Sequence, residues 1–320
     1  MSAPPREPFV VVLNPRAGAG RAGKLVPALE RALREAGAAH ELIETSGPRD
    51  ATRLVRDALR RGVRGIAVVG GDGTLGEAAG GFFDERGEPL GQGAWLGALP
   101  CGTGGDFRKT LGLPSTGPSG RDLEALVTRM LGAAPRPIDA GWLRYVGHDA
   151  KPAERAFLNI ASFGVGGLVD QLVNDAPKWM GGTPAFLIGT LRALRRYTAA
   201  EVRVSLDGGP ARQTRIVNMA VANGRFFGGG MHVAPEAILD DGLFDVVGIE
   251  TSVRGSLALA GRLYAGKHLG QPGVTHARAR VVYAEAVRPD EHVLLDVDGE
   301  SAGRLPATFE IRPGAILFRG

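Results

Sequence analysis

Residues 70–74 (GGDGT) combine the residue types that place a backbone and a carboxylate beside a phosphate group. The apolar run before them, 66–69, is typical of a buried strand, and it ends at two glycines. Glycine has no side chain, so the backbone can approach a ligand closely, and a helix that opens after the turn presents N–H groups to anions. Asp72 adds a carboxylate, which suits a phosphate site chiefly when magnesium lies between the two. The segment therefore predicts a magnesium-phosphate site, with a structural glycine turn capped by Asp72 as the alternative.

A second glycine-rich segment follows the first apolar run of the chain. Residues 18–23 fit the dinucleotide-binding pattern G-x-G-x-x-G, and residues 18–24 also fit the GxxxxGK pattern of phosphate-binding loops. Neither match is complete, because residues 14–17 separate the strand from the first glycine and Leu25 replaces the Ser or Thr that would bind magnesium. Both patterns predict a flexible, basic loop at the start of a helix. Such a loop either holds phosphate or is simply solvated.

The elements that must position these turns alternate between strand and helix. Strands are expected at 9–13, 40–44, 65–69 and 95–99, and helices at 25–36, 50–60, after Thr74, around Phe107 and at 123–131. Short apolar strands separated by helices predict a parallel sheet covered on both faces. Residues 133–137 have the composition of a linker, so the first domain is expected to span 1–137.

The second half of the chain has a different character. Strands are expected at 157–161, 202–206, 216–222, 243–249, 281–283, 293–297 and 309–311, and helices at 184–197 and 256–267. Turns rich in Pro, Gly and Asp separate the strands, which predicts a mostly antiparallel β domain over 138–320. The expected fold class is therefore an α/β N-terminal domain with a parallel sheet, followed by a mostly antiparallel β domain.

Composition limits the class of protein. The chain has 320 residues, 44% of them hydrophobic and 22% charged, with a net charge of +4, which is typical of a soluble globular protein. Its basic residues are scattered, which argues against nucleic-acid binding and leaves a weak attraction to anionic membrane surfaces. A single cysteine, Cys101, and the absence of a signal-peptide pattern or a membrane-spanning apolar run favour the cytoplasm.

Six segments, in order along the chain, resemble the diacylglycerol-kinase-type lipid kinases, which include soluble bacterial lipid kinases and sphingosine and ceramide kinases. They are LNPRAGAG at 13–20, GGDGTLGE at 70–77, PCGTGGDF at 100–107, NIASFGVGG at 159–167, ANGRFFGGGMHVAPEAILDDGLFDVV at 222–247 and DVDGE at 296–300. The resemblance implies a nucleotide-binding catalytic domain, a β-sandwich-like lipid-binding domain and an active site in the cleft between them. It also implies ATP and Mg²⁺ as cofactors.

The resemblance assigns most of its positions to nucleotide binding. The implied contacts are Asn14, Pro15, Arg16, Ala17, Gly18, Thr45, Gly70, Gly71, Asp72, Gly73, Thr74, Leu75, Gly76, Glu77, Thr103 and Asp106. Within this set, Asp72 and Asp106 would belong to the magnesium and water network near the transferred phosphate. Asp72 is therefore also counted among the catalytic residues.

Two further groups of residues are implied in the second half. A structural metal site corresponds to Asp241 with the backbone oxygens of Ile238 and Leu243. In the DGE segment, Asp298 and Glu300 are the candidates for activating the lipid hydroxyl, and Glu300 is favoured.

The chain departs from the family pattern near the phosphate site. Gly76 and Gly105 stand where the family usually has Asn, and Arg108 stands where a small residue is more usual. Two lost amides suggest altered nucleotide handling or weakened activity. The acidic positions are intact, so an active kinase is still expected.

Several functional readings remain open from the sequence. The first is an ATP-dependent kinase of diacylglycerol or a related lipid, which contacts the membrane peripherally when active. The segment 177–196, apolar and then basic, is a candidate for that contact, and a helix packed on the β domain is its alternative. The second hypothesis is an NAD-kinase-like enzyme, and the third is a non-catalytic nucleotide- or lipid-binding protein. A Rossmann oxidoreductase is the fourth and least favoured hypothesis. The lipid is not encoded by any motif, and a homodimer stays open.

Overall fold

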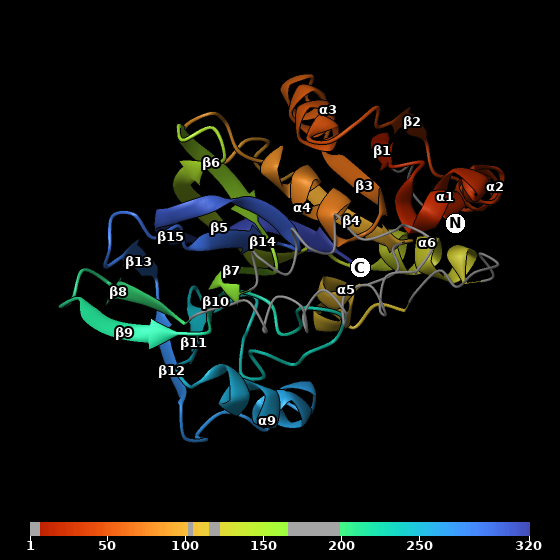
Figure 1. Cartoon of the computed structure of the whole chain (residues 1–320). Helices are drawn as coiled ribbons and strands as arrows, with labels where there is room; N and C mark the ends of the chain where they lie inside the picture. Colours follow the sequence, from red (N-terminus) through yellow and green to blue (C-terminus); the bar gives the residue numbers. More distant parts are fainter. Residues whose placement is uncertain (1–6, 102–104, 115–121, 166–198) are drawn as a thin grey trace. The chain divides into compact units, whose positions relative to one another are not determined.

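The computed structural model describes residues 7–101, 105–114, 122–165 and 199–320. Two expectations lie outside these residues, namely the nucleotide contact at Thr103 and the segment 177–196 with its helix. The chain forms two compact units (Figure 1): unit 1 holds Met1–Ile138 and Gly314–Gly320, and unit 2 holds Asp139–Pro313. Within the described ranges, no helix combines the length and apolar character needed to cross a bilayer.

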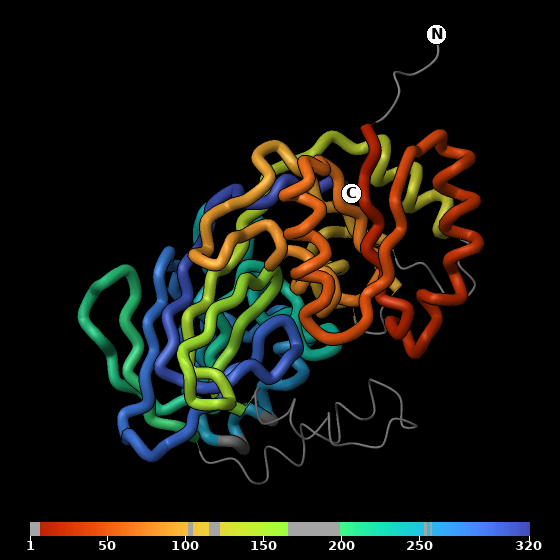
Figure 2. The backbone as a smooth tube through the Cα atoms, turned by 90° about the horizontal axis from the view of Figure 1, so that it is seen from above, coloured from red at the N-terminus to blue at the C-terminus, as the bar shows by residue number. Residues whose placement is uncertain are grey.

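Unit 1 is built on a parallel sheet. Its strands lie in the order β2(His40–Glu44), β1(Phe9–Leu13), β3(Gly65–Gly70), β4(Trp95–Pro100) and the end of β15(Glu300–Arg319). Every residue of β1 and β3 is buried, as expected for central strands of a sheet with both faces covered. Figure 2 shows the C-terminus ending among the red and orange elements of this unit.

Helices cover both faces of this sheet. Their bounds are α1(Ala17–Lys24), α2(Val26–Glu35), α3(Asp50–Arg60), α4(Asp72–Gly80), α5(Asp106–Leu111) and α6(Leu123–Gly132). Leu33 of α2 and Met130 of α6 share one buried cluster with Val69 of β3. Successive strand residues point to opposite faces, so Val68 points the other way, where it lines a pocket together with Leu75 of α4. The expected α/β layering is confirmed.

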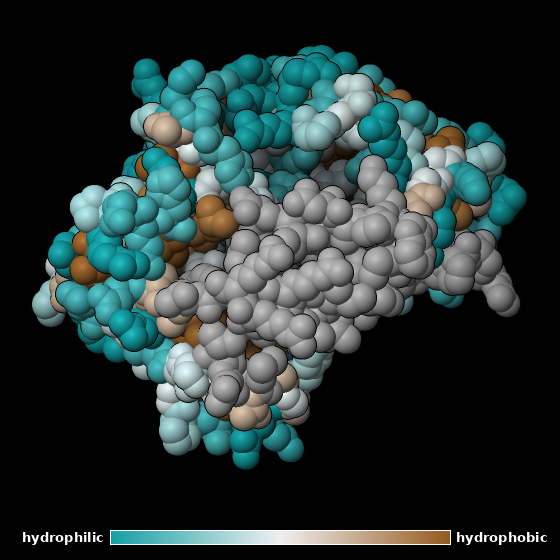
Figure 3. Space-filling view, viewed as in Figure 1, coloured by the Kyte–Doolittle hydropathy of each residue, from teal (hydrophilic) through white to brown (hydrophobic). Residues whose placement is uncertain are grey.

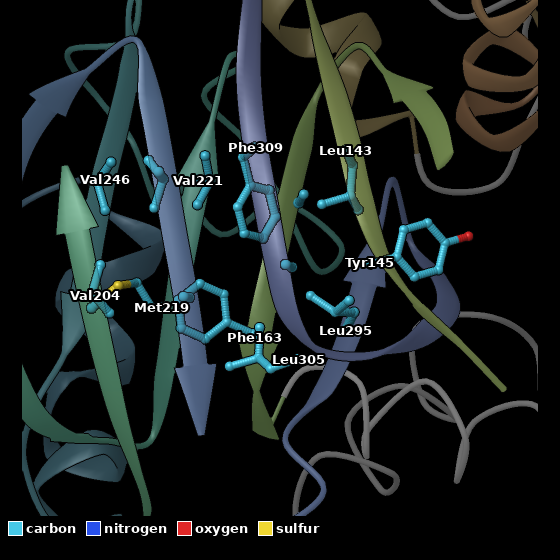
Figure 4. Close-up of a cluster of buried hydrophobic side chains, with 14 of the residues drawn as sticks. Leu143, Tyr145, Phe163, Val204, Met219, Val221, Val246, Leu295, Leu305 and Phe309 are labelled. Carbon is cyan, nitrogen blue, oxygen red and sulfur yellow. The ribbon is translucent and has the colours of Figure 1, made fainter. Parts of the chain in front are cut away.

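Unit 2 is mostly antiparallel. Its elements are β5(Arg136–Gly147), β6(Pro152–Phe157), β7(Ile160–Gly164), β8(Ala200–Leu206), β9(Arg212–Ile216), β10(Asn218–Ala222), β11(Phe244–Ile249), α9(Val253–Tyr264), β12(Val274–Ala279), β13(Val281–Ala286), β14(Leu294–Val297) and most of β15. One run of paired strands is β12-β11-β10-β7-β14-β15, and β15 also pairs with β13 and β5. Figure 4 shows the apolar core between these strands, with Phe163 and Phe309 stacked at a centroid distance of 5.9 Å.

Several element boundaries differ from the expected ones. The segment expected as a linker, 133–137, already contains the start of β5 at Arg136. The strands β5, β6, β9 and β12 were not expected, because polar residues interrupt their apolar pattern. The expected strand 309–311 is the middle of the 20-residue strand β15. Residues 314–320 were assigned to the second domain but lie in unit 1, because Leu317 to Arg319 pair with β4.

Candidate active site

The turns after β1 and β3 are joined by hydrogen bonds around Asn14. The Asn14 side chain donates from Nδ2 to Oγ1 of Thr74 at 3.0 Å, and its Oδ1 accepts the backbone N–H of Arg16 at 3.0 Å. The Asn14 backbone N–H donates to the carbonyl of Val69 at 3.0 Å. Two of the expected nucleotide contacts, Asn14 and Thr74, therefore lie side by side at the carboxyl ends of neighbouring parallel strands.

The segment after Pro15 is more ordered than a flexible loop. It forms α1, whose residues Gly18, Ala19 and Gly20 have left-handed backbone angles with φ of 61°, 59° and 82°. A Cβ atom at Gly18 would overlap the backbone carbonyl oxygen of Cys101, just after β4. Both the left-handed backbone and the lack of space for a Cβ atom require glycine at position 18. The turns after β1 and β4 thus also approach each other closely.

The GGDG turn brings its backbone close to its own helix. A Cβ atom at Gly70 would lie 2.7 Å from Cβ of Thr74, so the turn has room only for glycine there. Gly71 is extended, and α4 begins at Asp72, three residues earlier than expected. Leu75 and Gly76 are buried within α4, and Gly73 lies in its first turn. The helix therefore opens directly at the two glycines, which is the arrangement that exposes N–H groups to an anion.

Two expected contacts serve a structural purpose in this structure. The carboxylate of Glu77 accepts the backbone N–H of Arg49 at 2.9 Å, where the chain enters α3 with a left-handed residue. The backbone N–H of Thr45 donates to the carbonyl of Leu13 at 2.8 Å and extends the β1–β2 pairing. Both residues thus fix neighbouring elements of the sheet edge at which the glycine turns lie.

Asp72 and Asp106 form the acidic part of this edge. Oδ2 of Asp72 accepts the backbone N–H groups of Asp106 at 2.5 Å and of Phe107 at 3.2 Å, which are the first residues of α5. Burial raises the pKa of Asp72 above its usual value, and the Asp106 charge adds to this shift, while the two N–H groups oppose it. Asp106 is itself buried and pairs with Lys109 at 3.0 Å. Two carboxylates are therefore held together beside the GGDG turn.

A small pocket lies over this turn. Its lining combines the turn and β-strand ends with one face of α5: Val68, Gly70, Gly71, Asp72, Leu75, Ala98, Pro100, Arg108 and Leu111. Arg108 is the only cationic residue among these lining residues. The pocket thus offers backbone, a carboxylate and a guanidinium to a ligand.

The donor types at this edge fit magnesium bound together with a nucleotide. Within the described residues, no group of three or more His, Cys, Asp or Glu side chains could hold a metal alone. Magnesium usually takes one or two carboxylates and completes its shell with water and phosphate oxygens. Asp72 and Asp106 would supply those carboxylates, and the phosphates would come from the nucleotide.

In unit 2, Asp298 is a hydrogen-bonded anchor. Its carboxylate accepts the backbone N–H groups of Leu158 at 3.0 Å, Asn159 at 3.0 Å and Ile160 at 3.1 Å, at the bend between β6 and β7. Burial raises its pKa to about 6, although the three N–H groups and Arg155 act in the opposite direction. Asp298 and Gly299 both have positive φ, 53° and 84°, and form the two-residue turn between β14 and β15. The bound carboxylate thereby holds this hairpin in place.

Glu300 follows that turn and is much more accessible. Its side chain is 42% exposed, and Oε2 accepts a hydrogen bond from Nη2 of Arg155 at 3.1 Å. Arg155 lies 145 residues earlier in the chain, on β6, so no local sequence pattern could have identified it. Of the two acidic residues of the DGE segment, Glu300 is the one that a ligand can reach.

The residues expected to form a structural metal site do not fit a divalent ion in this structure. Oδ1 of Asp241 accepts the backbone N–H of Leu243 at 3.1 Å, and Oδ2 pairs with the guanidinium of Arg278. The same guanidinium lies 3.7 Å from the carboxylate of Asp245, which is fully buried. Arg278 therefore supplies the positive charge at this loop, to which the side chain of Ile238 adds an exposed apolar surface.

Matches to protein families agree with this division of the chain. Residues 8–143 match the diacylglycerol kinase catalytic domain, and residues 159–318 match the YegS C-terminal NAD kinase beta sandwich-like domain. A "probable lipid kinase YegS-like" protein of Pseudomonas putida is 32% identical over 89% of this chain and 86% of its own length. A diacylglycerol kinase of Bacillus subtilis is 27% identical over 93% of this chain and 91% of its own.

Solved structures share the fold. The crystal structure of a diacylglycerol kinase from Bacillus anthracis superposes with a TM-score of 0.69 at 22% identity, covering 98% of this chain and 96% of the other. Yeast NADH kinase in complex with NADH gives a TM-score of 0.53 at 11% identity, covering 98% of this chain and 83% of the other. The catalytic-domain match and the named relatives define the class, a kinase that transfers a phosphoryl group. Within that class, the chain belongs to the diacylglycerol-kinase-type lipid kinase family, as its motifs indicated.

Proposed function

We propose that this kinase transfers the γ-phosphate of ATP to a hydroxyl group of diacylglycerol or a related lipid. The observation that carries the proposal is the carboxylate of Asp72, fixed by two backbone N–H groups at the first residue of α4 and directly after two glycines. Diacylglycerol is the lipid in the names of several relatives, which supports it as the first substrate to test.

The sheet edge of unit 1 is suited to the phosphates of ATP. Phosphoryl transfer mainly needs alignment and neutralisation of charge on the phosphate oxygens. Helix α4 opens directly after Gly70 and Gly71 with no side-chain cap, so the backbone N–H groups of its first turn can face phosphate. Magnesium held by Asp72 and Asp106 would supply additional positive charge to the phosphate oxygens.

We assign the proton acceptor to Glu300 and a positioning role to Asp298. A general base must reach the substrate hydroxyl, and Glu300 has an accessible carboxylate. The oxygens of Asp298 already accept three backbone N–H groups, so a substrate would have to displace those bonds. Asp298 instead fixes the turn that presents Glu300, and Arg155 orients the Glu300 carboxylate.

The lipid acceptor implies a contact with a membrane surface. On the face seen in Figure 3, the described residues are mostly hydrophilic, with smaller apolar groups. The large apolar side chains that are exposed in the described part of the chain are Ile238, Tyr264 and Tyr283. The segment 177–196, which we expect to make the membrane contact, lies outside the described residues. Because Trp179 belongs to the segment expected to contact the membrane, Trp179→Ala should reduce activity on vesicles more than it reduces ATP binding.

The substrate can be identified by offering acceptors separately. Purified protein with magnesium and γ-labelled ATP would be incubated with vesicles that carry diacylglycerol, sphingosine or ceramide, and with NAD in buffer without lipid. We expect label in an organic-extractable product, with diacylglycerol as the best acceptor. Label on NAD alone would instead identify a soluble-substrate kinase of the kind that shares the fold, and bound ATP without transfer would indicate a binding protein.

A further inference from the structure

Arg108 stands out in the pocket over the GGDG turn because it brings a full positive charge there. The pocket is lined by Gly70, Gly71 and Asp72 of the turn together with Arg108 and Leu111 of α5. The Arg108 charge also acts on Asp72, where it partly opposes the burial that raises the pKa of that carboxyl. A guanidinium in this pocket lies near the turn at which phosphate is expected to bind.

The side chain of Arg108 is held in a defined position. Its Nη1 donates to the backbone carbonyl of Leu113 at 2.8 Å, just after the end of α5. A guanidinium has five N–H donors, so this single bond leaves others for a ligand. Arg108 is half-buried, and an arginine fixed at one nitrogen loses little further freedom when it binds an anion.

Gly105 makes room for this arrangement. Its backbone is left-handed, with φ of 67° and ψ of 46°, at the residue before α5. A Cβ atom at position 105 would lie only 2.7 Å from Nε of Arg108. Any side chain at position 105 must therefore displace the Arg108 side chain, and the two positions are sterically coupled.

We propose that Arg108 is a nucleotide-binding residue that contacts the terminal phosphates of ATP, and that Gly105 is required to leave its side chain in that position. The inference rests on the proposed use of ATP at this sheet edge. Arginine suits the role because its planar guanidinium forms paired hydrogen bonds with phosphate oxygens. The same charge would oppose the negative charge that the phosphates bring near Asp72 and Asp106.

The test is nucleotide affinity, measured by calorimetry on the full chain at fixed magnesium with a non-hydrolysable ATP analogue and with AMP. We expect Arg108→Gln to lower the affinity for the triphosphate analogue at least tenfold and the affinity for AMP less than twofold. Arg108→Lys should recover part of the lost affinity for the triphosphate analogue. Arg129→Gln is the matched control, because Arg129 donates to the neighbouring carbonyl of Gly112 at 3.4 Å and does not line the pocket. It should change neither affinity.

Gly105→Asn provides an independent arm that retains Arg108. We expect it to lower the affinity for the triphosphate analogue about as much as Arg108→Gln does. In a protein that already carries Arg108→Ala, it should lower this affinity no further. Thermal unfolding of each variant identifies any that fails to fold. Triphosphate affinity within twofold of the unsubstituted protein in both Arg108→Gln and Gly105→Asn would overturn this inference alone. An unsubstituted protein that does not bind the analogue would overturn the ATP proposal as well.

Discussion

Asp72 accepts the backbone N–H of Asp106 on its carboxylate at a distance of 2.5 Å. Each residue is the first of its helix, so this bond fixes the start of α5 against the start of α4. Asp106 is buried and Asp72 is partly buried, and the two charges raise each other's electrostatic cost, which a bound magnesium ion would offset. Asp72 therefore has a structural contact that is separate from the catalytic part proposed for it.

The two uses of Asp72 can be separated by substitution. Asp72→Asn keeps an oxygen that accepts the N–H groups of Asp106 and Phe107, so we expect unfolding free energy within about 1 kcal/mol of the unsubstituted protein. Asp72→Ala leaves both N–H groups without that acceptor and should cost about 1–3 kcal/mol. Urea denaturation measures both. Equal stability of the two variants would show that the bond does not hold α5.

Substitution of Asp298 should mainly lower folding stability, whereas substitution of Glu300 should mainly lower kinase activity. In Asp298→Asn an N–H₂ group must replace one acceptor oxygen, so we expect a loss of about 1–3 kcal/mol in unfolding free energy. Glu300→Gln removes a half-exposed charge and should change stability by less than about 1 kcal/mol, while kinase activity falls at least a hundredfold. Stability by urea denaturation and activity at saturating ATP are measured on both. The assignment is reversed if Asp298→Asn is the stable, inactive variant.

Asp298 also predicts a pH dependence of stability. Its pKa is about 6 in the folded protein against 3.8 as the ordinary value, so between these values the folded state holds a proton that the unfolded state releases. The Asp298 contribution to unfolding free energy therefore decreases as pH rises from about 4 to 6, by at most about 3 kcal/mol. Urea denaturation at several pH values should show this slope in the unsubstituted protein, and it should be reduced in Asp298→Asn. Equal slopes in both would contradict the raised pKa.

Two glycines of α1 give a matched pair of substitutions. Both Gly18 and Gly20 have positive φ, so alanine at either position costs about 1–2 kcal/mol of backbone strain. At Gly18 the added methyl group also meets the carbonyl oxygen of Cys101, whereas at Gly20 nothing lies within 4 Å. We therefore expect Gly18→Ala to lower stability and ATP affinity clearly more than Gly20→Ala. Similar losses for the pair would mean that the close approach to Cys101 is unimportant.

The Arg278 ion pairs predict that the Asp241 loop is independent of metal. We expect a chelator such as EDTA to leave the thermal midpoint unchanged, because the guanidinium already supplies the positive charge. Arg278→Gln should lower unfolding free energy by about 1 kcal/mol, since it leaves buried Asp245 with less compensation. Arg280→Gln, an exposed change two residues further on, is the control. A lower midpoint of the unsubstituted protein in EDTA would favour a bound structural metal instead.

The sequence predicted the parts of the site that depend on local geometry. The GGDG turn is visible because glycines follow a wholly apolar strand, and the Asp298-Gly299 turn is visible because Asp-Gly favours a two-residue hairpin. Pairings between distant residues were not predictable in this way. Neither the contact of Arg155 with Glu300 nor the return of β15 to pair with β4 leaves a periodic pattern, because each depends on tertiary packing alone.

The most direct test of lipid phosphorylation is a single-turnover measurement of label transfer from γ-labelled ATP to diacylglycerol in mixed vesicles. The unsubstituted protein is compared with Asp72→Asn and Glu300→Gln. Glu285→Gln serves as the control, since Glu285 pairs with Arg203 at 2.8 Å much as Glu300 pairs with Arg155. We predict transfer by the unsubstituted protein and by Glu285→Gln, and rates at least a hundredfold lower in the other two variants. Transfer that survives both Asp72→Asn and Glu300→Gln, or no transfer to any lipid despite bound ATP, would contradict the proposed function.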